Sequence, residues 1–61
     1  MALRVKRLRA QRGLTQKQLA AKAGISRVFL ARIETRRQDP TVGTLEKLAK
    51  ALRVKPARLL E

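Results

Sequence analysis

The chain has 61 residues, 44% of them hydrophobic, but it contains one Phe and no Trp or Tyr. It has no Cys or His and four acidic residues, which excludes disulfides and removes most metal ligands and the commonest catalytic base. This length has room for one domain, and the aliphatic composition favours a helical bundle over a β-sandwich. We therefore expect one all-α domain over residues 1–61, with no metal, no cofactor and no enzymatic activity.

The charge indicates the class of partner. Sixteen Lys and Arg residues against four Asp and Glu give a formal net charge of +12, which attracts polyanions. Nucleic acid is the first candidate, and an anionic membrane surface is the second. No apolar stretch approaches the roughly 20 residues that a membrane span needs, and the basic N-terminus lacks the apolar run of a signal peptide. We expect a cytoplasmic protein.

The first two predicted helices are separated by a short turn. Apolar spacing predicts a helix over residues 3–12, which Gly13 ends because glycine adopts a positive φ without strain. Thr15 and Gln18 have the spacing of a capping box, so a second helix begins after Thr15. Gly24 ends that helix.

Three further segments complete the expected fold. Ser26 caps a third helix that continues to about residue 35, with Leu30 and Ile33 facing the core. Pro40 forbids a continuous helix, and Thr41 caps a fourth. The residues of that helix spaced for burial are Leu45, Leu48, Ala49 and Leu52. Residues 56–60 are predicted to form a fifth helix or a turn.

Residues 15–34 have the pattern of a helix-turn-helix. Two short helices meet at a tight turn containing Gly24, and Ala20 is small enough to let them cross closely. Any small helical bundle shares the apolar periodicity. It does not require this joint spacing together with a charge of +12.

Several groups of residues, at fixed spacing through most of the chain, resemble the pattern of a known family. They are the segment of residues 9–16, Leu19-Ala20, Ala23-Gly24-Ile25-Ser26, Ile33-Glu34, Pro40-Thr41, Thr44-Leu45 and residues 48–52. Together they resemble the XRE family of Cro and phage-repressor type helix-turn-helix domains over residues 4–61. The resemblance implies a five-helix, lambda-repressor-like fold whose third helix enters the major groove of DNA.

The outward face of the third helix carries the candidate base contacts. A helical wheel that turns Leu30 and Ile33 inward places Val28 and Arg32 on the opposite side, with Arg27 on a flank. Arginine pairs bidentately with guanine, so we predict base contacts for Arg27 and Arg32, with phosphate contact as the alternative. Val28 either packs on a thymine methyl group or is simply exposed. Phe29 we expect to be partly packed.

The resemblance also implies contacts to the DNA backbone. Gln16, the first residue of the second helix, donates to a phosphate in this family, assisted by the helix N-terminus. The alternative is a solvated amide. The remaining predicted phosphate contacts are Lys17, Arg36, Arg37 and Thr41, with Gly43 nearby.

Glu34 requires a cationic partner, because an anion in the last turn of a helix opposes the helix dipole. The resemblance pairs it with Arg9 in a buried, bidentate, structural ion pair. Breaking one side of such a pair costs roughly 3–5 kcal/mol. Arg36 occupies a position where many family members have Gly, so either Arg36 is left-handed or the third helix ends differently.

The predicted function is sequence-specific binding of double-stranded DNA by a transcriptional regulator, a repressor, acting as a homodimer through its C-terminal region. Leu59 and Leu60 either form that contact or close the monomer core. The alternative is a protein-interaction module of the same fold, such as an antitoxin or a coactivator-type protein. A nonspecific single-strand binder is disfavoured by the lack of exposed aromatic residues. No small-molecule ligand is predicted.

Overall fold

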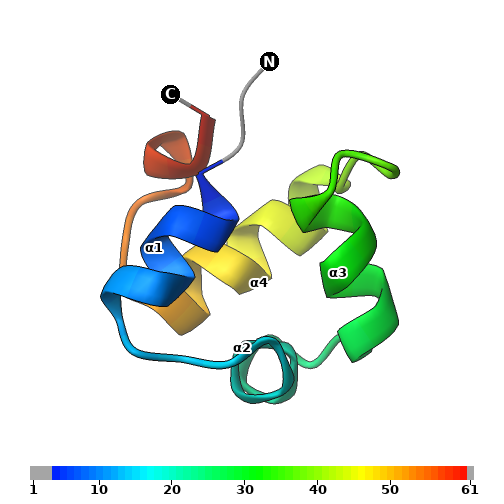
Figure 1. Cartoon of the computed structure of the whole chain (residues 1–61). Coiled ribbons are helices and arrows are strands. Elements are labelled where there is room, and N and C mark those ends of the chain that lie inside the picture. The colour runs from blue at the N-terminus through cyan, green and yellow to red at the C-terminus, as the bar shows by residue number, and fades with distance from the viewer. Residues whose placement is uncertain (1–3, 61) are drawn as a thin grey trace.

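The computed structural model describes residues 4–60, and they form an all-helical fold without strands. The α-helices are α1 (Val5–Gln11), α2 (Gln16–Ala23), α3 (Arg27–Glu34) and α4 (Val42–Leu52), as Figure 1 shows. The fifth expected segment is a 3-10 helix, η1 (Pro56–Leu60), rather than a fifth α-helix. No helix within the described part is long and apolar enough to cross a membrane.

The helix boundaries follow local signals. The capping box is confirmed: Gln18 donates its backbone N–H to Thr15 Oγ1 at 3.0 Å, and Thr15 donates its own to Gln18 Oε1 at 2.8 Å. Ser26 Oγ accepts from the Phe29 amide at 3.0 Å and caps α3. Gly24 ends α2 with φ 70°.

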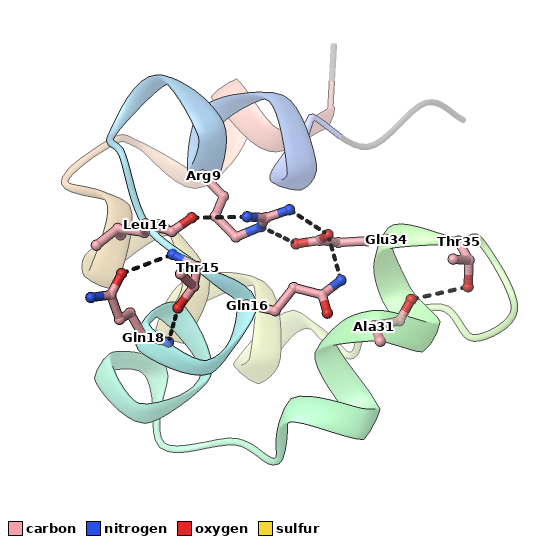
Figure 2. Close-up of polar contacts among 8 residues, drawn as sticks. All are labelled: Arg9, Leu14, Thr15, Gln16, Gln18, Ala31, Glu34 and Thr35. Carbon is pink, nitrogen blue, oxygen red and sulfur yellow. Dashed lines mark hydrogen bonds and ion pairs between the residues drawn. The ribbon is translucent and has the colours of Figure 1, made fainter.

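The predicted boundaries of the first and third helices differ from the structure. The expected start of the first helix, at residue 3, lies outside the described residues, and α1 runs from Val5 to Gln11, one residue short of the predicted end. The third helix ends at Glu34, one residue early, because Thr35 leaves helical geometry. Its hydroxyl donates to the carbonyl of Ala31 at 3.0 Å (Figure 2).

One aliphatic core holds the helices together. α2 packs against both α3 and α4, while α4 also packs against α1 and η1. The largest side chains that are fully buried are Leu19, Leu30, Ile33, Leu48, Leu52, Leu59 and Val5. Leu45, which we expected to be buried, is only half-buried at the edge of this core.

The structure distinguishes Leu59 from Leu60, the two leucines considered for either core packing or a dimer contact. Leu59 is fully buried and closes the core, whereas Leu60 is 40% exposed. The Leu59 carbonyl also accepts from the Arg4 amide at 3.1 Å, which ties η1 to the start of α1 (Figure 1). Only Leu60 of the pair is therefore accessible to another molecule.

We predict that Leu30→Ala lowers the free energy of unfolding by about 2–5 kcal/mol, because it opens a cavity between α3 and the rest of the core. Urea denaturation measures the change. Val28→Ala, on the exposed face of the same helix, is the control and should alter stability by less than about 0.5 kcal/mol. Equal effects of the two substitutions would contradict the assignment of the buried face.

Candidate nucleic-acid interface

The outer face of α3 carries the three residues predicted to contact bases. Leu30 and Ile33 are fully buried, and this fixes the rotation of the helix about its axis. Val28 is 57% exposed as a result, and Arg27 and Arg32 are exposed as well. The structure thus brings all three together on solvent-facing positions of one helix.

Phe29 lies between the two faces of α3. It is half-buried and packs against the core, as its position on the helical wheel predicts. Its ring is therefore used mainly for packing rather than presented to a ligand.

Glu34, at the end of α3, is paired with Arg9 of α1. Arg9 Nε lies 2.8 Å from Glu34 Oε2, and Arg9 Nη2 donates to Oε1 at 3.2 Å. Arg9 Nη1 also donates to the Leu14 carbonyl at 2.8 Å, in the segment that leads into α2 (Figure 2). The Glu34 side chain is 1% exposed and the Arg9 side chain 15%, so the bidentate pair is shielded from water.

Gln16 joins this pair from the first turn of α2. Its Nε2 donates to Glu34 Oε1 at 3.0 Å (Figure 2). The side chain is therefore not the freely solvated amide that we considered, since one of its N–H groups is held by a buried carboxylate. The neighbouring Lys17 is exposed. Sequence reasoning did not find the Gln16–Glu34 contact, because the two residues meet only when α2 and α3 are assembled.

The segment after α3 follows the first of the two paths considered for it. Arg36 adopts a left-handed conformation with φ 61°. Its amide donates to the Ile33 carbonyl at 3.1 Å, and the Arg37 amide donates to the Arg32 carbonyl at 2.9 Å, so these two carbonyls near the end of α3 are satisfied. Both arginine side chains are exposed.

Thr41 and Gly43 lie where this segment enters α4. The Thr41 hydroxyl accepts from the Thr44 amide at 3.1 Å and so caps the helix. Both Thr41 and Gly43 are exposed. Thr41 therefore has a structural task in addition to the phosphate contact predicted for it.

The surface formed by the start of α2, the outer face of α3 and residues 35–43 is strongly cationic. Its acidic residues are Glu34, which is neutralised by Arg9, and Asp39. Arginines project from it on α3 and on the following segment, and the N-terminus of α2 adds a partial positive charge. Such a surface is suited to a polyanion with phosphates on either side of a groove.

The family is shown by comparison with known sequences. A family described as Helix-turn-helix matches residues 5–59. The chain belongs to this helix-turn-helix family. Its relatives include the immunity repressor protein of Bacillus phage phi105, with 46% identity over 57 residues, 93% of this chain and 40% of the relative. The chain thus spans well under half of that repressor.

Two further comparisons agree with this assignment. The HTH-type transcriptional regulator y4dJ of Sinorhizobium fredii is 44% identical over 54 residues, which are 88% of this chain and 70% of that protein. Among solved structures, the Bacillus subtilis biofilm regulator SinR in complex with DNA has a TM-score of 0.90 and 36% sequence identity. That alignment covers 95% of this chain and 94% of that one. The lambda-repressor-like architecture expected from the sequence is confirmed.

We predict that Arg9→Ala lowers the free energy of unfolding by about 3 kcal/mol, because it leaves the Glu34 carboxylate buried with Gln16 as the one remaining side-chain donor among the described residues. Thermal and urea denaturation measure the loss. Arg7→Ala removes the same charge from an exposed position of α1 and should change stability little. An unchanged melting temperature for Arg9→Ala would refute the structural role of the pair.

We predict that Arg36→Gly raises the free energy of unfolding by about 0.5–1 kcal/mol, because glycine adopts the left-handed conformation without the strain of a Cβ atom. Differential scanning calorimetry measures the change. Arg37→Gly, at the next position and without a positive φ, should instead be neutral or destabilising. A lower stability for Arg36→Gly would show that the left-handed residue is not strained.

Proposed function

We propose that the chain is the DNA-binding part of a sequence-specific transcriptional regulator, a repressor, which inserts α3 into the major groove of double-stranded DNA. The observation that carries this proposal is the exposed row of Arg27, Val28 and Arg32 on a helix whose opposite face is fully buried. Its support also comes from relatives described as a phage immunity repressor and as transcriptional regulators. A solved relative bound to DNA adds to this support.

In this proposal Arg27 and Arg32 bind the edges of guanine bases. The two hydrogen-bond acceptors of guanine in the major groove match the paired donors of a guanidinium group, and each such contact contributes about 1–3 kcal/mol of discrimination. Val28, between them in sequence, packs against a thymine methyl group. These three side chains are those that the buried face of α3 directs outward.

The proposed phosphate contacts flank α3. Gln16 and Lys17 bind the backbone on one side through the start of α2, and Arg36, Arg37 and Thr41 bind it on the other. The hydrogen bond between Gln16 and Glu34 supports this role, because it fixes the amide in one orientation and leaves its second N–H to donate. A donor held in place loses little conformational entropy on binding.

We further propose that residues 1–61 act as one domain in the cytoplasm, and that it binds DNA as a homodimer through its C-terminal region. Leu60 in η1 is an exposed apolar side chain at that end of the chain. Two copies would then bind half-sites about one helical turn, roughly 34–36 Å, apart.

The test is selection of bound sequences from random duplex DNA at several salt concentrations, which should enrich a palindromic site. We predict that Arg32→Ala relaxes the preference at one base position of that site, with a loss of about 1–3 kcal/mol for the preferred base. Lys17→Ala should weaken binding to all sequences alike and lower the salt dependence.

The controls separate a base contact from general attraction. Lys6→Ala removes one exposed charge from α1, outside the interface, and should leave the base preferences unchanged. A pool without any enriched sequence would contradict sequence-specific regulation. Uniform weakening by both Arg32→Ala and Lys17→Ala would remove Arg32 from the proposed base contacts.

A further inference from the structure

A second cationic surface lies between the end of α2 and the second half of α4. It is a hollow of about 340 Å³ lined by Lys22, Ala23, Lys47, Lys50, Ala51 and Arg53. No residue of α3 or of residues 35–41 is among those that line it. It is therefore separate from the candidate nucleic-acid interface, and in Figure 1 the end of α4 runs away from α3 toward the other side of the molecule.

A smaller hollow continues this surface toward α1. It has a volume of about 240 Å³ and shares Lys22, Ala51 and Arg53 with the first. Its other lining residues are Arg12, Leu14 and Leu52. The smaller hollow therefore also has cations around it, and the half-buried Leu14 gives it aliphatic surface.

Favourable interactions with helix dipoles explain only part of the positive charge around the two hollows. Cations in the last turn of a helix are favourable, which accounts for Lys22 in α2 and Lys50 in α4. Each helix C-terminus carries only about −0.5 of an elementary charge, against four full positive charges around the larger hollow. Among the described residues that line either hollow there is no Asp or Glu. The four cations thus repel one another without an acidic partner in the lining.

The backbone fixes where one of these cations leaves the chain and holds the side chain of another. Arg53 has φ 58° at the end of α4, where glycine is the residue that fits without strain. Its amide donates to the Lys50 carbonyl at 3.2 Å. Arg12 Nε donates to the Leu52 carbonyl at 3.1 Å, which places its guanidinium group beside the smaller hollow.

We propose that this surface, the α2–α4 hollow, binds a small ligand that carries two or more phosphate groups, such as a nucleoside diphosphate or triphosphate. The volume of the larger hollow falls within the usual range of small-molecule sites, about 300–1,000 Å³. The small side chain of Ala51 leaves room for phosphates to approach among the cations, and the half-buried Leu14 offers apolar surface to the rest of the ligand. This proposal replaces our expectation of no small-molecule ligand.

A compact anion suits this surface better than a duplex. Phosphates of a DNA strand are spread along its length and face a groove or ridge of similar length. Here the cations line a hollow of about 340 Å³, so a ligand with two or three linked phosphates places several negative charges near them. Charge-assisted hydrogen bonds from Lys and Arg to phosphate oxygens are the expected contacts.

The test titrates the isotope-labelled protein with inorganic triphosphate and with ATP, and follows backbone amide signals by NMR. The largest shifts should fall on residues 22–24 and 50–54. Lys50→Ala should weaken triphosphate binding about fivefold in calorimetry, as expected for the loss of one partly screened charge contact. Lys6→Ala, which removes an exposed charge from α1, is the matched control and should change affinity less than twofold.

The remaining outcomes each overturn the proposal in a distinct way. Equal weakening by Lys50→Ala and Lys6→Ala would show attraction to the net charge rather than a site. Shifts confined to α3 would place the anion on the DNA-binding surface. Weaker DNA binding by Lys50→Ala with unchanged triphosphate binding would identify the DNA backbone as the occupant. Because Lys50 is outside the proposed base and phosphate contacts, failure here leaves the selection of DNA sequences as an independent test.

Discussion

The buried carboxylate of Glu34 is the constraint on which the interface depends. It closes α3, and its two oxygens accept three hydrogen bonds, two from Arg9 and one from Gln16. Arg9 reaches from α1 and also binds the Leu14 carbonyl, so one network joins α1, the segment before α2, the start of α2 and the end of α3. A carboxylate that is 1% exposed is stable only with these partners in place, and it therefore fixes how the two helices of the helix-turn-helix sit relative to each other.

This network also separates the structural charges from those available to DNA. Arg9 is one of sixteen basic residues, but its guanidinium group is engaged in structural contacts with Glu34 and with the Leu14 carbonyl. Among residues 4–60, no acidic side chain pairs with Arg27 or Arg32, and both arginines are exposed. In this small domain an arginine is thus either bonded within the fold, as Arg9 is, or left exposed for the proposed contacts with DNA, as Arg27 and Arg32 are.

Two arginines occupy left-handed positions that glycine would fill without strain. Arg36 follows α3 beside the proposed DNA interface, and Arg53 follows α4 at the α2–α4 hollow. At each site the chain accepts backbone strain and gains a positive charge on a surface that faces solvent. α2 connects the two surfaces, with Gln16 at one end of the helix and Lys22 at the other.

The sequence by itself determined the order of the helical segments and most of their boundaries, because caps, glycines and apolar spacing act over a few residues. Thr15, Ser26 and Thr41 cap the helices that they were predicted to cap, and the inward face of α3 follows from its periodicity. Only the tertiary structure decided that Leu59 is buried while Leu60 is exposed, that Gln16 binds Glu34, and that cations of α2 and α4 surround a hollow. These features depend on contacts between elements that are far apart in the sequence. Caps and apolar spacing within one element do not predict those contacts.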